Sequence, residues 1–242
     1  MISIQKDVPL AQYTTFRVGG PAKYFVEVTN IEELKEALGY AKKNNLEFFI
    51  LGGGSNLLIS DNGFSGLTIK MKLNEIKIGE GIIEAEAGVP LAKLVKDSIL
   101  NSLTGLEWAA GIPGSLGGAI RGNAGAYENE TKDIIETVKV LNSETLEIGE
   151  YKVEECEFGY RKSRFKKQGN LIILSAKLKL KIGNKEESLK KMQDILAKRT
   201  SVQPQGASAG SFFMNPIVQN DKIIKEYEDE KSVKVNDGKI PA

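Results

Sequence analysis

The sequence predicts an α+β fold that is divided into two or three structural units. Three observations lead to this prediction. The chain has 242 residues, which is more than a typical single domain. Roughly the first seventy residues alternate between strand-like and helical patterns, whereas the pattern from about Ile76 onward is mixed. Beyond Pro204 the chain changes again, first to small residues and then to a charged stretch without clear periodicity.

The first unit has the order strand, helix, strand and glycine-rich turn. Residues Tyr24–Val28 are strand-like, and Asn30 can cap a following helix whose apolar residues recur at helical spacing. The apolar run Leu46–Leu51 then ends abruptly in Gly52–Asn56, and a further strand is expected near Leu67–Met71. This order places a ligand at the carboxyl end of a strand.

The second unit is expected to combine antiparallel strands with helices. Lysines alternate with apolar residues over Lys177–Ile182, which is typical of a half-buried antiparallel strand. In chain order, the expected elements are a strand at Ile82–Ala87, a helix that begins near Pro90, a hairpin of Val138–Leu141 and Leu146–Ile148, the strand at Lys177–Ile182, and a helix that ends near Arg199.

The composition excludes several kinds of chemistry. The chain contains no histidine, which removes Ser-His-Asp triads, Cys-His pairs and histidine-ligated metal sites. It also removes the usual histidyl anchor of a covalently bound flavin. Catalysis must therefore depend on other polar side chains, on backbone amides or on a cofactor, and we expect no metal site.

Charge and hydropathy restrict the partners. The chain has 33 basic and 32 acidic residues, so no basic excess indicates nucleic acid or an anionic membrane. Apolar runs such as Leu171–Leu174 are too short to span a bilayer, and no signal peptide follows Met1. The single cysteine, Cys156, is expected to be a small buried residue. We therefore expect a cytoplasmic protein without an obligate protein partner.

The stretch Gly52–Asn56 is the first candidate for ligand binding. Consecutive glycines allow successive N–H groups to converge on phosphate oxygens, and Ser55 and Asn56 add polar contacts. The stretch is not a P-loop, and it lacks the third glycine of the dinucleotide fingerprint. A structural turn is an equally good interpretation of this stretch alone.

A second glycine-rich stretch covers Gly111–Ala119 and is followed by Asn123–Ala126. A tight turn at Pro113 and Gly114 leads into small side chains, which suits a backbone pressed against a flat, bulky ligand. The alternative is close packing of a helix on a strand, with glycine as a spacer.

Two polar stretches are candidates for substrate contacts and proton transfer. Phe158–Ser163 contains Arg161, and an arginine can clamp a carboxylate through two parallel hydrogen bonds; the alternative is an exposed arginine. In Ala207–Pro216, Ser211 has no histidine to activate it as a nucleophile. A hydroxyl that delivers a proton is the better functional hypothesis, and a serine in a turn is the alternative.

Together these stretches resemble one family, the UDP-N-acetylenolpyruvoylglucosamine reductases, also called UDP-N-acetylmuramate dehydrogenases (the MurB family). The matching segments follow the family's order over nearly the whole chain: Tyr13–Ala22, Leu51–Leu58 (LGGGSNLL), Gly111–Ile120 (GIPGSLGGAI), Asn123–Glu130 (NAGAYENE), Phe158–Lys166 (FGYRKSRFK) and Ser208–Pro216 (SAGSFFMNP).

The resemblance implies an α+β, FAD-binding fold of the vanillyl-alcohol-oxidase (PCMH) type. It divides the chain into an FAD-binding α/β subdomain at residues 1–72, an FAD-binding α+β subdomain at 73–203, and the start of a substrate-binding domain at 204–242. FAD would bind non-covalently between the two subdomains.

The resemblance also implies a set of site residues. Gly52–Asn56 would cradle the FAD pyrophosphate, while Tyr160 and Asn215 would contact the substrate. The residues implied to bind FAD are Gly52, Gly53, Gly54, Ser55, Asn56, Gly111, Ile112, Pro113, Gly114, Ser115, Gly117, Asn123, Ala124 and Gly125.

The implied reaction has two halves. NADPH first reduces the flavin, and UDP-N-acetylglucosamine enolpyruvate then takes up the hydride and becomes UDP-N-acetylmuramate, a peptidoglycan precursor. Arg161 would clamp the substrate carboxylate and stabilise the enolate that forms, and Ser211 would protonate that enolate.

The sequence departs from the family in two places. It ends at Ala242, before the segment in which relatives carry a catalytic glutamate, so we expect a C-terminally truncated enzyme with impaired turnover. Met214 stands where relatives usually carry lysine. Two alternatives stay open: an FAD-binding protein of the same fold with little or no reductase activity, and a flavin oxidase of the same superfamily that acts on alcohols or sugars.

Overall fold

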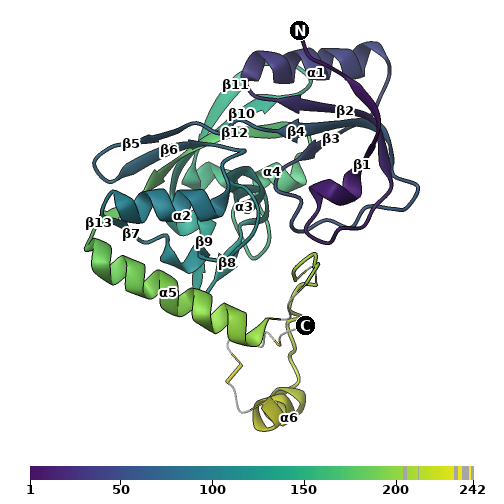
Figure 1. The fold of residues 1–242 in the computed structure, drawn as a ribbon. Coiled ribbons are helices and arrows are strands. Elements are labelled where there is room, and N and C mark those ends of the chain that lie inside the picture. Colours follow the sequence, from purple (N-terminus) through teal and green to yellow (C-terminus); the bar gives the residue numbers. More distant parts are fainter. Residues whose placement is uncertain (204–205, 212, 232–233, 236–239, 241–242) are drawn as a thin grey trace.

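The protein is described from a computed structural model, which covers residues 1–203, 206–211, 213–231, 234, 235 and 240. One sheet and a covering helix form one part of the molecule, and a second sheet with several helices forms the other (Figure 1). The segment after helix α5 (Lys185–Val202) passes close to the first part of the molecule and then carries helix α6 (Asp221–Lys231), which lies apart from both sheets (Figure 1). The division at residues 72 and 203 stays a prediction.

The first sheet has four strands in the order β1-β2-β4-β3. Their bounds are Gln5–Pro9 (β1), Pro21–Val28 (β2), Phe48–Leu51 (β3) and Phe64–Met71 (β4). β4 pairs in parallel with β2 and with β3, whereas β1 pairs antiparallel with β2. The predicted strands are confirmed, and the glycine-rich turn at Gly52 begins at the carboxyl end of β3.

Helix α1 (Ile31–Lys43) connects β2 to β3 and begins where the sequence predicts. The Asn30 side chain accepts a hydrogen bond of 2.9 Å from the Glu33 N–H, which satisfies one of the free donors of the first turn. One face of the helix, which includes Leu34 and Leu38, is buried against the sheet.

The second sheet has five strands in the order β11-β10-β12-β6-β5, and all its neighbours pair antiparallel. Their bounds are Ile76–Ile78 (β5), Ile82–Glu86 (β6), Ile135–Asn142 (β10), Ile148–Lys152 (β11) and Leu171–Lys179 (β12). Two short pairs lie beside it: Leu103–Thr104 (β7) with Lys181–Ile182 (β13), and Gly125–Ala126 (β8) with Asn129–Glu130 (β9).

The remaining helices lie between the strands in the chain or after them. The α-helices are Leu91–Leu100 (α2), Leu116–Gly122 (α3), Arg164–Lys167 (α4), Lys185–Val202 (α5) and Asp221–Lys231 (α6). Short 3-10 helices lie at Leu10–Tyr13 (η1), Glu107–Ala109 (η2), Thr131–Ile134 (η3) and Val153–Cys156 (η4). Within the described parts of the chain, no helix has the length and apolar character needed to cross a bilayer.

The predicted hairpin is present, but its loop is longer than expected. β10 and β11 pair from Leu141 with Ile148, so Leu146 lies in the loop instead of in the second strand. The Asn142 side chain accepts a hydrogen bond of 2.9 Å from the Glu144 N–H, and this side-chain turn begins the loop directly after β10, while β11 begins two residues later than predicted. Leu146 is exposed and adopts a φ of 59°.

The strand predicted over Lys177–Ile182 is broken at Leu180. β12 ends at Lys179, although the Leu180 N–H still donates, at 2.8 Å, to the carbonyl of Gly81, the residue before β6. Lys181 and Ile182 then pair with β7. The alternation of lysine and apolar residues does not reveal this change of partner, which leaves the Ile182 side chain 75% exposed.

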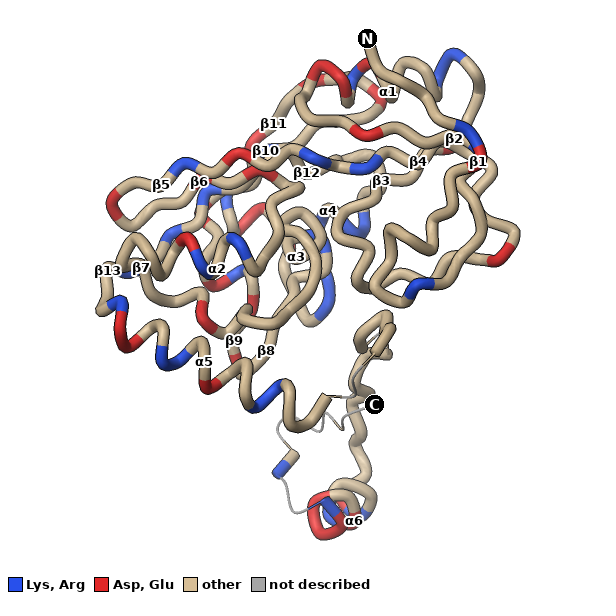
Figure 2. Tube along the Cα trace, viewed as in Figure 1, with Lys and Arg blue, Asp and Glu red and all other residues tan. Residues whose placement is uncertain are grey.

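Helix α6 was not predicted. None of its residues is buried, and its apolar side chains are confined to Ile223, Ile224 and Tyr227 among charged residues, so the stretch has the pattern of a charged chain without clear periodicity. Lysines and acidic residues are interspersed along it, and both signs of charge also occur on α1, α2 and α5 (Figure 2).

A large apolar core joins the two sheets. It includes Val26 and Leu67 of the first sheet together with Val138 and Leu178 of the second. Cys156 belongs to this core and is fully buried, which confirms the prediction of a small buried residue. Burial raises the pKa of its thiol to about 12, so the thiol stays protonated and unreactive at neutral pH.

A buried carboxylate attaches helix α5 to the body of the protein. Glu107 in η2 is 1% exposed and accepts hydrogen bonds from the Ser188 hydroxyl at 2.6 Å and from the Thr104 hydroxyl at 2.7 Å. The Gly105 N–H donates a third at 3.0 Å, and Lys191 of α5 lies 3.7 Å away. Burial acts to raise the pKa of Glu107, but these hydrogen bonds outweigh it and hold the pKa below its usual value.

Replacing Glu107 with Gln should therefore destabilise the protein by about 1–3 kcal/mol, because an amide cannot accept from all three donors. Since the folded-state pKa is lowered, the stabilisation by Glu107 is present above the ordinary glutamate pKa and is lost as the pH falls below it. Urea unfolding at pH 7 and pH 4 measures both effects. Glu80→Gln, at an exposed position, is the control; equal stability of the two variants at pH 7 would contradict this role.

Candidate cofactor site

The two glycine-rich stretches meet backbone to backbone. Gly52–Asn56 follows β3, and the turn at Pro113 and Gly114 precedes α3. A Cβ atom on Gly53 would lie 2.5 Å from the Gly114 Cα, so a side chain at this position has no space. The Ser55 hydroxyl donates to the Pro113 carbonyl at 3.0 Å and fixes one loop against the other.

Gly54 shows why this turn requires glycine. Its φ is +66°, in the left-handed region, and a Cβ atom there would lie 1.9 Å from the Tyr13 carbonyl oxygen. The Thr15 N–H donates to the Gly54 carbonyl at 3.1 Å. The loop is thus tied both to η1 and to the second glycine-rich stretch.

A cavity of about 370 Å³ lies beside these loops. It is lined by Gly52, Gly53, Lys70, Met71, Lys72, Asn74, Gly88, Pro90, Gly114 and Ser115. Ser115 is 4% exposed, and its hydroxyl has no hydrogen-bond partner among the described residues. A buried polar atom without a partner is costly, so this hydroxyl fits a polar ligand in the cavity. Glycine backbone, the Lys70 ammonium group and a free hydroxyl together fit a phosphate-containing cofactor.

Several residues that the resemblance assigns to the cofactor make contacts within the protein itself. A Cβ on Gly111 would meet Arg199 of α5 at 3.1 Å, and Ile112 packs against the core. The Gly117 N–H donates to the Ala87 carbonyl at 2.8 Å, and a Cβ at Gly117 would lie 2.9 Å from the Ala87 Cβ. This is the close helix-to-strand packing that was the alternative interpretation, and a cofactor contact of Gly117 stays a prediction.

Asn123 and its neighbours hold the loop after α3. Asn123 is fully buried with a φ of 43°, and its side-chain amide donates to Glu130 at 3.1 Å and to the Gly159 carbonyl at 3.0 Å. Its side-chain oxygen accepts from the Lys132 N–H at 3.0 Å. The Ala124 carbonyl accepts two hydrogen bonds from Thr131, and Gly125 lies in β8. The Asn123 side chain therefore positions this loop next to the Phe158–Ser163 segment.

Arg161 lies in that segment, close to the loop. One of its guanidinium nitrogens donates to the Gly125 carbonyl at 3.3 Å, and the guanidinium lies 5.5 Å from the centre of the Tyr160 ring. Arg161 adopts a φ of 55°. Burial acts to raise the pKa of Glu130, but hydrogen bonds from Lys132 and Asn123, together with the charges of Lys132 and Arg161, lower it overall. A carboxylate thus stays ionised near the predicted substrate clamp.

The segment that carries Ser211 returns to the first glycine-rich loop. The Asn56 amide donates to the Ala209 and Ser211 carbonyls, both at 3.0 Å. The Thr15 hydroxyl donates to the Ser208 carbonyl at 2.7 Å, and the Ser208 N–H donates to the Thr15 carbonyl at 3.1 Å. These contacts hold the backbone around Ser211 and leave the Ser211 residue exposed.

The two residues implied to bind substrate are in direct contact. The Asn215 N–H donates to the Tyr160 hydroxyl at 3.2 Å. This contact joins the Arg161 segment to the segment of Ser211, so the predicted catalytic residues belong to two neighbouring segments. Among the described residues, no cluster of metal-ligating side chains is present.

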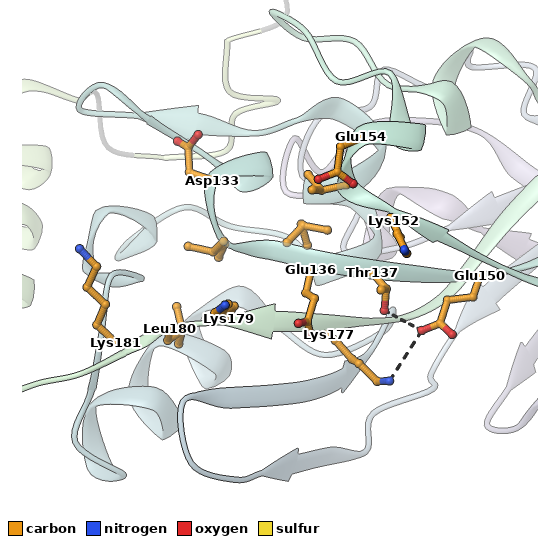
Figure 3. Close-up of a pocket in the computed structure, with 13 residues that line it drawn as sticks. Asp133, Glu136, Thr137, Glu150, Lys152, Glu154, Lys177, Lys179, Leu180 and Lys181 are labelled. Carbon is orange, nitrogen blue, oxygen red and sulfur yellow. Dashed lines mark hydrogen bonds and ion pairs between the residues drawn. The ribbon is translucent and has the colours of Figure 1, made fainter.

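A larger cavity than the one beside the glycine-rich loops lies elsewhere in the described structure. About 780 Å³ in volume, it is open and lies over β10, β11 and β12, and it holds none of the predicted site residues (Figure 3). Its lining mixes lysines with acidic residues, and Glu150 there accepts a hydrogen bond of 2.6 Å from Thr137 and lies 3.8 Å from Lys177 (Figure 3). Since it holds none of the predicted site residues, we do not assign the function to it.

Two residues of the site escaped the sequence analysis. Thr15 connects to Ser208 across 193 positions, a contact that no local pattern indicates. Lys70 lies on β4 and lines the cavity between the glycine-rich loops, but a lysine on a strand gives the same signal as a solvated surface residue.

The chain is similar in sequence to an FAD-binding family and in fold to a solved oxidase. Residues 22–146 match the model of a family described as FAD binding domain. Cholesterol oxidase from Brevibacterium sterolicum has a similar fold, with a TM-score of 0.58 at 12% identity over 75% of this chain and 38% of that one. The chain is therefore an FAD-binding protein with the α+β, PCMH-type fold, as predicted.

Closer relatives show the family. UDP-N-acetylenolpyruvoylglucosamine reductase from Carboxydothermus hydrogenoformans is 42% identical over 227 residues, which cover 92% of this chain and 74% of the relative. The crystal structure of UDP-N-acetylenolpyruvylglucosamine reductase from Thermus caldophilus gives a TM-score of 0.76 at 34% identity, over 93% and 79% of the two chains. The chain belongs to the UDP-N-acetylenolpyruvoylglucosamine reductase family and is an FAD-dependent oxidoreductase.

Proposed function

We propose that the protein uses NADPH, through bound FAD, to reduce UDP-N-acetylglucosamine enolpyruvate to UDP-N-acetylmuramate in peptidoglycan precursor synthesis. The observation that carries the proposal is the convergence of the family's segments on the Gly52–Asn56 loop. This loop contacts the second glycine-rich stretch through Ser55 and the Ser211 segment through Asn56. These contacts support a cofactor site and a proton donor at the same loop.

FAD, when bound, supplies the transfer of hydride from NADPH to the substrate. The protein's own residues would do the rest. The backbone of Gly52–Gly54 and the free Ser115 hydroxyl would hold the cofactor's phosphates. Arg161, oriented by the Gly125 carbonyl and the Tyr160 ring, would bind the substrate carboxylate and stabilise the negative charge of the enolate. Tyr160 and Asn215, which share a hydrogen bond, would both contact the substrate.

Ser211 would donate the proton that completes the reduction. The chain has no histidine, so a hydroxyl is the expected donor to the carbon next to the carboxylate. Asn56 holds the Ser211 carbonyl, which fixes the backbone while the side chain stays open to a substrate. The buried Cys156, as the single cysteine, supports a reducing cytoplasm as the place of action.

The test is a stopped-flow absorbance experiment on the FAD-loaded protein. The flavin is first reduced anaerobically with NADPH, and UDP-N-acetylglucosamine enolpyruvate is then added. Reoxidation by this substrate is the expected result. Reduction without reoxidation would refute the reaction and favour an FAD-binding protein without reductase activity. Rapid reoxidation by oxygen in place of the substrate would favour a flavin oxidase.

A further inference from the structure

Lys70 is a half-buried cation that has no acidic partner among the described ion pairs. It lies on β4, and its ammonium group donates a hydrogen bond to the Gly52 carbonyl and lies 6.0 Å from the centre of the Tyr13 ring. Lys72, two residues further along the strand, is different, because its ammonium forms an ion pair of 2.5 Å with Glu27. Of the two lysines, only Lys72 is neutralised by a carboxylate at contact distance within the described structure.

The surroundings of Lys70 contain further groups that suit an anion. The Gly52 carbonyl accepts the hydrogen bond from Lys70. Gly52 also lies against Ser115, because a Cβ on Gly52 would be 2.7 Å from the Ser115 hydroxyl. That hydroxyl is buried and without a partner in the described chain. Gly53 and Gly114 complete the same cavity with backbone alone. A cation, a free hydroxyl and glycine backbone thus line one cavity.

An anion in this cavity would relieve two unfavourable features at once. Burial lowers the pKa of Lys70, with Glu27 acting to raise it and Lys72 to lower it. The charged form of Lys70 is therefore incompletely compensated in the protein alone. The Ser115 hydroxyl is likewise unsatisfied, and phosphate oxygens accept hydrogen bonds from both kinds of donor.

We propose that Lys70 is the cationic ligand of the diphosphate bridge of FAD, with the Ser115 hydroxyl and the backbone of Gly52 and Gly53 as its neutral neighbours. The proposal rests on the FAD binding assigned above, and it adds a charged residue to a site otherwise built from glycine and serine. One of the three N–H donors of the ammonium stays on the Gly52 carbonyl, so Lys70 would connect the loop to the cofactor.

The test compares Lys70→Met with Lys72→Met in the purified full-length chain. FAD affinity is measured from the quenching of flavin fluorescence at low and high salt, and the melting temperature of the FAD-free protein is recorded in parallel. We expect Lys70→Met to weaken FAD binding about 10–100-fold and to reduce its salt dependence, whereas Lys72→Met changes affinity by less than about threefold. The FAD-free Lys70→Met protein should melt at or above the wild-type temperature, because a poorly compensated charge is removed.

Two further variants sharpen the result. Lys70→Arg keeps the charge and should retain most of the affinity. Ser115→Ala should weaken FAD binding while leaving the FAD-free protein at least as stable, because its hydroxyl has no partner to lose. Unchanged affinity in Lys70→Met, or equal losses in Lys70→Met and Lys72→Met, would overturn the proposal, as would a loss matched by a lower melting temperature. These readouts are independent of turnover, so wild-type protein that holds FAD without reducing the substrate would refute only the proposed reaction.

Discussion

Replacing Ser211 with Ala is expected to slow reoxidation of the reduced flavin by UDP-N-acetylglucosamine enolpyruvate by about 10²–10⁴-fold, the usual contribution of a positioned proton donor. Reduction of the flavin by NADPH should keep its wild-type rate, because this half of the reaction does not use the Ser211 proton. The stopped-flow experiment separates the two halves, since each produces its own change in flavin absorbance. In water enriched with deuterium oxide, the wild-type reoxidation should slow measurably if the proton transfer limits its rate.

Ser211→Ala should change the hydroxyl without disturbing the backbone contacts of its segment. The polar contacts of the Ser211 segment with the first glycine-rich loop run through backbone carbonyls, so Ser211→Ala leaves the Asn56 hydrogen bond in place. Ser201→Ala in α5 is the matched control, because its hydroxyl bonds only within the helix, to the Lys198 carbonyl at 2.9 Å. Equal slowing of both half-reactions in Ser211→Ala would indicate a structural serine and contradict the assigned role.

The local parts of the fold could be predicted from the sequence because their signals are short-range. Asn30 caps α1 through a contact three residues away, and the glycines of the first loop follow an apolar run directly. The errors arose where the tertiary partner decides the outcome. Leu180 still bonds to Gly81 beside β6, but Lys181 and Ile182, which follow it, pair with β7. Alternating residues are compatible with either arrangement.

The candidate site could be predicted only where a residue type has a narrow use. Few structural roles require glycine, and Gly53 and Gly54 have one of them. At both positions the neighbouring backbone leaves no space for a side chain. Gly117 has the same sequence signal but packs against Ala87, so glycine alone does not separate a ligand contact from a packing contact. Neither Lys70 nor Thr15 could be identified as a site residue from the sequence, because each contacts neighbours that are distant in the chain.

Gly54→Ala should be the most damaging single-methyl addition in the first loop. The new Cβ would lie 1.9 Å from the Tyr13 carbonyl oxygen, and the φ of +66° is unfavourable for alanine by about 1 kcal/mol. Because the clash is with backbone, η1 or the loop must shift, and the Thr15 hydrogen bond to the Gly54 carbonyl would be strained. We expect a loss of about 3 kcal/mol or more in the free energy of unfolding, a fall of roughly 6–12 °C in melting temperature, and loss of FAD from the purified protein.

Gly39→Ala provides the opposite control with the same chemical change. Gly39 lies inside α1, and a Cβ there would meet no atom within 4 Å. Alanine in a helix interior is favoured over glycine by roughly 0.5–1 kcal/mol, so this variant should melt slightly higher than the wild type and bind FAD normally. A Gly54→Ala protein that melted like the wild type would show that the loop can adopt another conformation, and the backbone contact between Gly54 and Tyr13 could then not be what holds the loop in position.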